Sequence, residues 1–292
     1  MTDSPLQDLT IGFIGAGNMA TSIICGLVSS GLSADKIFVS NPSPDKLNAL
    51  AKRFETLNTS RDNQWVAKQA DVLVIAVKPQ KIAQACAGFT TLDWDNKCVI
   101  SVAAGVTCNS LQQLTRPQVA IIRSMPNTPA TIGYGATGLF ANTYARQIDK
   151  GIAEAVFNCV GSSIWVEKES LMDVITAISG SGPAHYFLYL ESVIEAAIRH
   201  GLDPDIARQL ATQTALGAAA LAQQNTNIEI QQLRHNVTSP GGTTAAAVEV
   251  LIEKALPQTI ADAITASVNR GQQLAKIAES DLNAQLKSTK SS

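Results

Sequence analysis

The chemical pattern that stands out in this 292-residue chain is NVTSPGGTTAAAVEVL, which spans residues 236–251. Two adjacent glycines and two adjacent threonines precede a helical pattern, although both residue types are poor helix formers. A helix that begins near Pro240 would offer unpaired backbone amides at its positive end, and glycines would let a ligand approach them closely. We therefore predict a carboxylate site here. The alternative is an ordinary capped helix behind a Gly-Gly turn.

A second pattern, TIGFIGAGNMATSII at residues 10–24, places G-x-G-x-x-A between a predicted strand and a predicted helix. This is the context that a dinucleotide-binding turn requires. Gly15 permits the tight turn, Gly17 lets the backbone approach a pyrophosphate, and Ala20 still allows close helix packing. A simple glycine turn is the alternative. The predicted cofactor contacts in this segment are Gly15, Ala16, Gly17, Asn18 and Met19.

The segment FVSNPSPDKL, residues 38–47, ends the second predicted strand and indicates which cofactor is used. A site for NAD usually offers Asp or Glu near this point to bind the ribose 2′-hydroxyl, but the residue here is Asn41. A 2′-phosphate would meet no carboxylate, and Ser40, Ser43 or Lys46 can donate hydrogen bonds to it. We predict a preference for NADPH, with NADH possible. Ser43 could instead be an ordinary helix cap.

The first half of the chain alternates short apolar runs with helical patterns. Most of the runs are apolar on both faces, which predicts a parallel, doubly wound sheet of the Rossmann type. Ligands bind beyond the carboxyl ends of such strands, so AVKPQ (76–80) and SVAAGV (101–106) are further candidates. Strands are expected at 10–15, 36–40, 71–77, 98–104 and 119–125, and more weakly at 136–141 and 162–167.

Beyond Lys168 the strand patterns stop and alanine-rich helical patterns follow. We predict a Rossmann-like NAD(P)-binding domain at 1–167 and a helical substrate-binding and dimerisation domain at 168–292. The expected helix at 184–198 is apolar around most of its circumference, so it needs burial on all sides. This favours a partner subunit over a tight monomeric bundle.

Composition limits the classes of function. The chain is 46% hydrophobic and 16% charged with a formal net charge of −2, which predicts a soluble protein that does not bind nucleic acid. Its five cysteines form no C-x-x-C pair and no metal-ligand spacing, so we expect reduced thiols and no metal. We see no signal-peptide pattern and no apolar run of about 18 residues. A cytoplasmic protein without a membrane partner is expected.

Six motifs follow one another along the chain, namely GFIGAGNMA, AVKPQ, SVAAGV, RSMPNTP, SGSGPA and NVTSPGGTTAAAVEVL. In content and order they resemble those of the pyrroline-5-carboxylate reductase family, from about residue 10 to 275. The resemblance implies a helical domain that interlocks with a second subunit, in dimers that often form larger rings such as a pentamer of dimers. It implies cofactor contacts at Asn41, Ser43, Asn63, Val77, Lys78, Ala104 and Asn236.

The activity implied is reduction of 1-pyrroline-5-carboxylate to L-proline, the last step of proline biosynthesis. From Glu169 to Glu253 the chain has no lysine, so the usual base of β-hydroxy acid dehydrogenases is missing. A protonated cyclic imine is already electrophilic, and the enzyme must mainly position it. We predict Thr244 as the catalytic residue, its hydroxyl meeting the ring nitrogen. The predicted substrate-binding residues are Ser239, Gly241, Gly242, Thr243 and Thr244.

The chain departs from the family pattern at two positions. His185 stands where family members commonly carry Tyr, and Asn227 stands where they often carry Glu. The alternatives are a reductase of another cyclic or acyclic imine acid, and a noncatalytic dinucleotide-sensing module. A sensor would have no use for a carboxylate site in the second domain, which argues against it.

Overall fold

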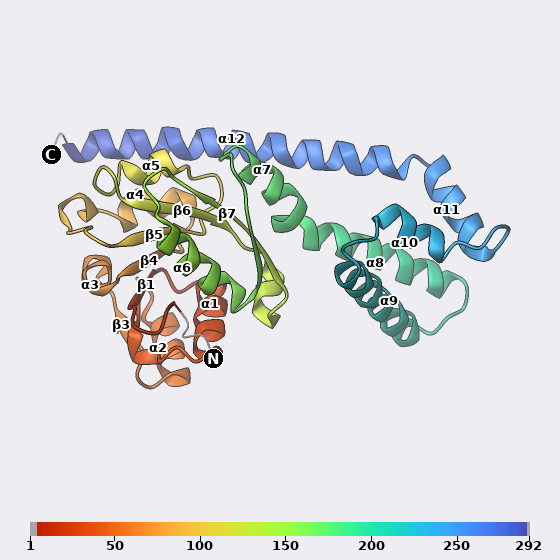
Figure 1. Ribbon diagram of the computed structural model, residues 1–292, viewed down its shortest axis with the longest axis horizontal. Helices are drawn as coiled ribbons and strands as arrows, with labels where there is room; N and C mark the ends of the chain where they lie inside the picture. Colours follow the sequence, from red (N-terminus) through yellow and green to blue (C-terminus); the bar gives the residue numbers. More distant parts are fainter. Residues whose placement is uncertain (1–4, 291–292) are drawn as a thin grey trace. The chain divides into compact units, whose positions relative to one another are not determined.

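A computed structural model describes residues 5–290, with side chains through Gln285 (Figure 1). Contacts divide the chain into two compact units. The first unit holds the residues up to Ser181 together with those from Ser267 onward, and the second holds Gly182–Ala266. Within the described residues, no helix is both long and apolar enough to cross a lipid bilayer.

An eight-stranded sheet forms the centre of the first unit, in the order β3-β2-β1-β4-β5-β6-β7-β8. All neighbouring strands pair in parallel except β6 and β7. From β1 the chain builds β2 and β3 on one side and then crosses to β4 on the other, so the topology reverses between β1 and β4. The strands are β1 Ile11–Ile14, β2 Ile37–Ser40, β3 Asn58–Ser60, β4 Val72–Ile75, β5 Cys98–Ser101, β6 Ala120–Met125, β7 Gly135–Ala141 and β8 Gly161–Trp165.

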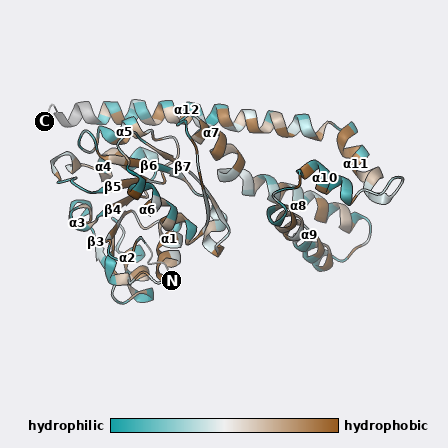
Figure 2. Ribbon diagram, viewed as in Figure 1, coloured by the Kyte–Doolittle hydropathy of each residue, from teal (hydrophilic) through white to brown (hydrophobic). Residues whose placement is uncertain are grey.

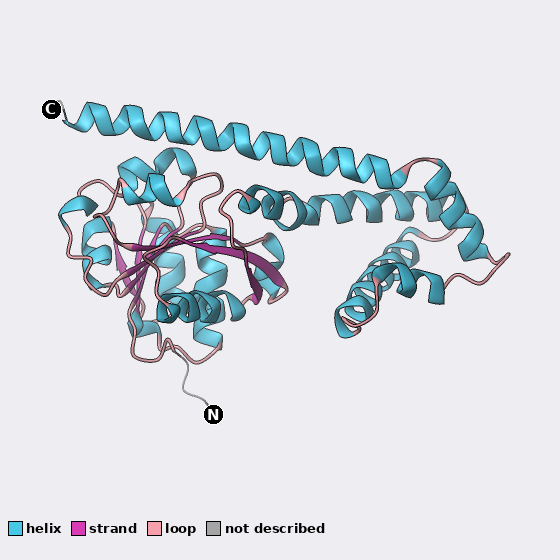
Figure 3. Cartoon of the chain, turned by 45° about the horizontal axis from the view of Figure 1, so that its top comes forward, coloured by secondary structure: helices cyan, strands magenta, loops and turns pink. Residues whose placement is uncertain are grey.

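Helices cover both faces of this sheet, which Figure 3 shows as a layer of strands between helices. Successive strand residues point to opposite faces, so Phe13 belongs to one buried cluster and Ile14 to the other. Helices α1, α2 and α6 supply the first cluster, and α3, α4 and α5 supply the second. Their bounds are α1 Asn18–Ser29, α2 Pro44–Arg53, α3 Asn63–Gln69, α4 Ile82–Ala85, α5 Cys108–Gln112 and α6 Gln147–Asn158.

The predicted Rossmann-like fold is confirmed, with differences at particular elements. The expected runs all contain strands, although most of these strands are shorter than the apolar runs. The prediction missed β3, because Asn58, Thr59 and Ser60 are polar, half-buried residues at the edge of the sheet.

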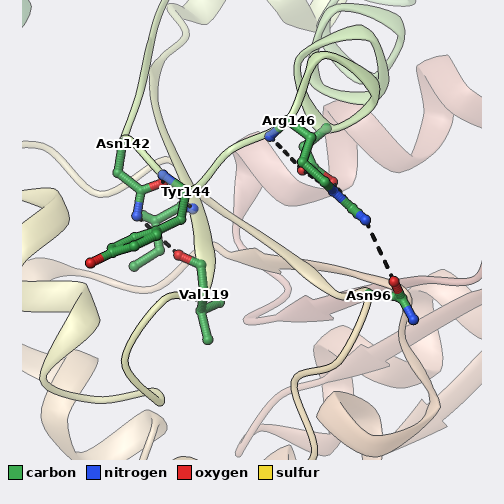
Figure 4. Close-up of polar contacts among 7 residues, drawn as sticks. Asn96, Val119, Asn142, Tyr144 and Arg146 are labelled. Atoms are coloured by element: carbon green, nitrogen blue, oxygen red, sulfur yellow. Dashed lines mark hydrogen bonds and ion pairs between the residues drawn. The ribbon is translucent and has the colours of Figure 1, made fainter.

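The loop before α6 is held by polar side chains at the edge of the sheet where β5 and β6 begin. Asn142 donates from Nδ2 to the Val119 carbonyl at 2.9 Å (Figure 4). Arg146 donates from Nε to the buried Asp149 carboxylate at 2.9 Å, and its Nη1 reaches Asn96 Oδ1 at 3.5 Å. These bonds fix the start of α6 near the amino ends of β5 and β6. The carboxyl ends of the parallel strands lie on the opposite side of the sheet.

Helix α7 (Leu171–Ile175) and the end of α12 (Leu256–Lys290) belong to the first unit by their contacts. Met172 is buried, and Ile175 packs so closely on β7 that a Cβ at Gly138 would lie 2.5 Å from it. The contacts therefore divide the chain after Ser181 and before Ser267, whereas the predicted boundary lies between residues 167 and 168. That boundary remains a prediction about functional domains.

The second unit consists of helices α8 Gly182–Arg199, α9 Pro204–Gln224, α10 Ile230–Asn236 and α11 Thr243–Glu253, with the start of α12. Along α8 to α11, Gly182 and Ala207 are the only described residues that are buried. Large apolar side chains are instead exposed, Tyr186 at 71% and Phe187 at 66%. Figure 2 shows hydrophobic segments on α8 and α11. This unit has no apolar core of its own, so its helices require a partner to cover them.

Candidate active site

The turn after β1 lies where the sheet topology reverses, which is where ligands bind in open α/β sheets. Gly15 has φ +105°, and its N–H donates to the Ser40 carbonyl at 2.8 Å. A Cβ at this position would lie 2.6 Å from the Ala76 carbonyl oxygen. Only glycine fits both the backbone angle and the space, so the tight turn expected at Gly15 is present.

Helix α1 begins directly after this turn with an open N-terminus. Gly17 is its N-cap, no side-chain cap bond is present, and among the described residues no atom beyond the adjacent ones lies within 4 Å of where a Gly17 Cβ would be. The backbone amides that follow, at Asn18 and Met19, start the helix and have no carbonyl one turn earlier to bind. An anion can therefore approach the positive end of α1 without meeting a side chain.

Asn41 joins the end of β2 to the glycine turn. Its side chain is buried, and Oδ1 accepts a hydrogen bond from the Ala16 N–H at 3.1 Å. Its Nδ2 donates to the Ser43 carbonyl at 3.2 Å. Asn41 therefore supports the shape of the turn, whatever it contributes to cofactor selection.

The two serines near Asn41 differ in what they can reach. Ser43 precedes α2 as its N-cap residue, but its hydroxyl makes no cap hydrogen bond, so the ordinary-cap alternative does not describe it. Ser40 is fully buried, and its hydroxyl donates to the Phe13 carbonyl at 3.4 Å. The expectation that Ser40 donates to a 2′-phosphate is wrong, because its side chain is fully buried and its hydroxyl bonds to the neighbouring strand β1. Lys46 is exposed on α2.

The other predicted cofactor residues of the first unit follow neighbouring strands. Ser40, Ile14, Ile75 and Ser101 lie in register across β2, β1, β4 and β5, so the segments after them share one edge of the sheet. Half-buried Val77 and exposed Lys78 follow β4, and exposed Ala104 follows β5. Asn63 begins α3 and donates from Nδ2 to the Ala85 carbonyl at 2.8 Å. The structure thus brings the strand-end candidates together at one edge.

In the second unit, α11 begins at Thr243 rather than near Pro240 as expected. A turn comes first, in which the Gly242 N–H donates to the Ser239 carbonyl at 3.0 Å. Gly241 has φ +68°, a left-handed conformation that ends the turn and favours glycine. A Cβ at Gly242 would lie 3.1 Å from the Ser239 oxygen, so the turn is also tight there. These two requirements explain the adjacent glycines.

The start of α11 presents several unused donors. Gly242 is its N-cap, and no side chain caps the helix. Ser239, Thr243 and Thr244 are exposed, and no bond to their hydroxyls is present within the described residues. The backbone amides at a helix start likewise have no partner within the helix. Free amides and hydroxyls are gathered in one turn, which suits a carboxylate.

Three further residues that the sequence singled out lie in the second unit. Asn236 ends α10 in the second unit, and its Oδ1 accepts from Gln232 Nε2 at 2.8 Å. His185 in α8 and Asn227 are exposed. No group of three or more His, Cys, Asp or Glu in the described part of the chain is placed to hold a metal ion.

The first unit contains a part-buried ion pair that was not predicted from the sequence. Arg123 on β6 is 7% exposed and donates from Nη1 to Glu169 Oε1 at 2.8 Å. The same oxygen accepts from the Cys108 N–H at 2.7 Å, so Glu169 joins β6 to the start of α5. Burial raises the pKa of the nearby Asp173 carboxyl, and Arg123 opposes that rise. An arginine within the apolar run VAIIRSM was the available signal.

Four of the five cysteines are poorly suited to act as nucleophiles. All five are free. Burial raises the pKa of the thiols of Cys86, Cys108 and Cys159 to about 12 in each case, and it also raises that of Cys98. These four thiols therefore stay protonated at neutral pH, and a protonated thiol is a poor nucleophile.

Comparisons with known proteins identify relatives that match both parts of the chain. A family model for pyrroline-5-carboxylate reductase dimerisation matches residues 169–274, and one for NADP oxidoreductase, coenzyme F420-dependent, matches residues 10–105. A pyrroline-5-carboxylate reductase of Pasteurella multocida is 43% identical over 93% of this chain and 100% of its own length. That of Escherichia coli is 35% identical over 91% and 98%.

Solved structures give the same result. A pyrroline-5-carboxylate reductase from Coxiella burnetii is 42% identical and superimposes with a TM-score of 0.87 over 91% of this chain and 98% of its own. A pyrroline carboxylate reductase of Plasmodium falciparum with NADP bound is 28% identical, with a TM-score of 0.80 over 92% and 99%. The likeness therefore extends over both units of the chain.

Proposed function

Because this chain belongs to the pyrroline-5-carboxylate reductase family, we propose that it reduces 1-pyrroline-5-carboxylate to L-proline with NADPH. The observation that carries the proposal is the turn from Ser239 to Thr244, whose free donors suit a substrate carboxylate. A dinucleotide-binding fold alone would fit many dehydrogenases. A carboxylate site outside that fold fits an enzyme that must hold a small cyclic acid.

In the proposed reaction the main task of the protein is to position the imine against the cofactor. NADPH, when bound, supplies a hydride to the imine carbon. The open start of α1 after Gly17 holds the pyrophosphate, and the strand ends with Val77, Lys78 and Ala104 line the cofactor. Asn63 and Asn236 complete the proposed cofactor contacts.

On the substrate side, the amides from Gly241 to Thr243 and the Ser239 hydroxyl hold the carboxylate. The Thr244 hydroxyl meets the ring nitrogen. A protonated imine needs no further activation, so the orientation of the ring against the hydride donor sets the rate.

We propose that NADPH is preferred over NADH, and Asn41→Asp tests why. The new carboxylate keeps an acceptor for the Ala16 N–H, so the glycine turn should hold, but it places a negative charge beside the 2′-phosphate. The ratio of kcat/KM for NADPH to that for NADH should fall about tenfold or more, since about 1.4 kcal/mol corresponds to tenfold.

The matched control for this substitution is Asn48→Asp, which adds the same charge at an exposed position on α2. It should leave the cofactor ratio unchanged. A wild-type enzyme with a higher kcat/KM for NADH than for NADPH would contradict the assignment of Asn41 and Ser43.

A homo-oligomer follows from the dimerisation-domain match and the exposed apolar helices of the second unit. We propose an obligate dimer, formed by the helices after residue 168, with a pentamer of dimers as the larger assembly. The absence of an apolar core in α8 to α11 supports this. We also propose a cytoplasmic enzyme, since its cysteines are unpaired and such thiols persist in a reducing compartment.

The experiment that tests the proposed function measures NADPH oxidation by the purified protein with three imines. We expect turnover with 1-pyrroline-5-carboxylate, and at least roughly tenfold lower kcat/KM with 1-pyrroline, which lacks the carboxylate that forms charge-assisted hydrogen bonds. The six-membered homologue separates the alternatives, because faster turnover of that ring would identify a different imine reductase. Binding of NADPH without oxidation of any of the three would identify a sensor.

A further inference from the structure

The C-terminal half of α12 lies in the first unit, beside α5 (Figure 1). Its less exposed residues recur every three or four positions, as on one face of a helix. Ser267, Gly271, Ala275 and Ala278 are half-buried, and Leu282 is only 6% exposed. We refer to residues 267–282 as the α12 strap. Residues 275–282 lie beyond the part of the chain that the family model matches.

The strap lies directly against the turn after β5. Gly105 has φ +75°, and a Cβ there would lie 3.3 Å from the backbone nitrogen and the Cα of Ala275. Any side chain at Gly105 would therefore press on the helix backbone. Gly105 directly follows Ala104, one of the proposed cofactor contacts. The strap therefore supports this turn at the residue next to that contact.

The strap also contacts the turn after β4. Leu282 belongs to the same buried cluster as Ile82 and Val106. Ala278 and Leu282 line one small cavity together with Pro79, which directly follows Lys78. Leu282 of α12 therefore lies in the same buried region as residues next to both turns that carry proposed cofactor contacts.

We propose that the α12 strap positions the cofactor-binding turns after β4 and β5, with Leu282 as its anchor. This inference rests on the proposed function, in which NADPH binds at the carboxyl ends of the parallel strands. The turns that carry Val77, Lys78 and Ala104 must be ordered before NADPH can bind tightly, and ordering them at the moment of binding would weaken affinity. The strap orders them beforehand through contacts that involve no ligand. Leu282 is a positioning residue, not a catalytic one.

The test is Leu282→Ala in the full-length protein, with NADPH affinity measured by titration and with steady-state kinetics. If the turns are in place in only about one in ten of the NADPH-free Leu282→Ala molecules, the apparent Kd and KM for NADPH rise about tenfold. The kcat at saturating NADPH should change by less than about twofold, because the occupied site is the same in both proteins. Leu282→Met, which conserves volume, should restore the affinity.

Ile277→Ala is the matched control. It removes an apolar side chain from the same helix, but Ile277 is 48% exposed, and the substitution should leave the Kd for NADPH unchanged. If Leu282→Ala does not fold, Ala275→Leu provides the second test, since a larger side chain there lifts the helix from Gly105. It should raise the KM for NADPH in the same way.

The possible failures are distinguishable. A wild-type protein that does not bind NADPH would contradict the proposed function, because the strand ends would then hold no cofactor. A wild-type protein that binds NADPH, beside Leu282→Ala and Ala275→Leu variants with unchanged Kd, would overturn the role of the strap alone. A variant whose kcat falls as much as its affinity would also overturn it.

Discussion

Replacing Thr244 by valine is expected to lower kcat/KM for 1-pyrroline-5-carboxylate roughly five- to two-hundred-fold. Valine keeps the shape of the side chain but leaves the ring nitrogen without a partner, which costs roughly 1–3 kcal/mol for a buried polar group. Each 1.36 kcal/mol of transition-state stabilisation is a factor of about ten in rate. NADPH affinity should barely change, because this hydroxyl serves the substrate. Steady-state kinetics and a cofactor titration measure both quantities.

Thr243→Val is the matched control. Both threonines are exposed in the first turn of α11, and neither hydroxyl has a partner within the described residues, so neither substitution removes an internal hydrogen bond. Differences in activity therefore report on the substrate. Thr243→Val should cost less, because that residue contributes mainly its backbone. Near wild-type activity in Thr244→Val beside a crippled Thr243→Val would mean that the roles are exchanged.

Leu210→Asp is expected to leave an inactive monomer. Leu210 on α9 is 58% exposed and, together with Tyr189 and Val193 of α8, lines an apolar groove of the second unit. If a partner subunit covers this groove, the substitution buries a carboxylate without a counter-charge, at a cost of several kcal/mol. A change of that size raises a dimer dissociation constant by orders of magnitude. Sedimentation and NADPH oxidation should both register the loss.

Gln209→Asp adds the same charge at a neighbouring exposed position of α9 that does not line the groove. This control should remain an active oligomer. The proposal of an obligate dimer fails if the wild-type protein sediments as a stable, active monomer at micromolar concentration.

Local chemistry made much of this protein predictable from its sequence. The apolar runs predicted the parallel sheet, and glycines at positions 15 and 17 predicted the turn and the open start of α1. The motifs also identified the family, and relatives up to 43% identical confirm that identification. Each of these signals is contained in a short segment, whose conformation depends mainly on its own residues.

The features that the sequence did not reveal depend on contacts between distant segments. The direction of the Ser40 hydroxyl is set by the neighbouring strand, and the partner of Arg123 lies at Glu169. The start of α11 was misplaced because a proline begins many helices, whereas here Gly241 adopts a left-handed conformation first. The burial of Leu282 in the cluster of Ile82 and Val106 could likewise not be predicted, because these residues are far from it in the sequence.

A crystal structure with NADPH and L-proline tests most directly whether the α11 turn holds the substrate carboxylate. We predict carboxylate oxygens at about 2.7–3.2 Å from the backbone amides of the turn, and Thr244 Oγ1 within the same distance of the ring nitrogen. The NADPH pyrophosphate should lie at the start of α1. A proline carboxylate bound away from residues 239–244, with the α11 amides left to water, would contradict the account.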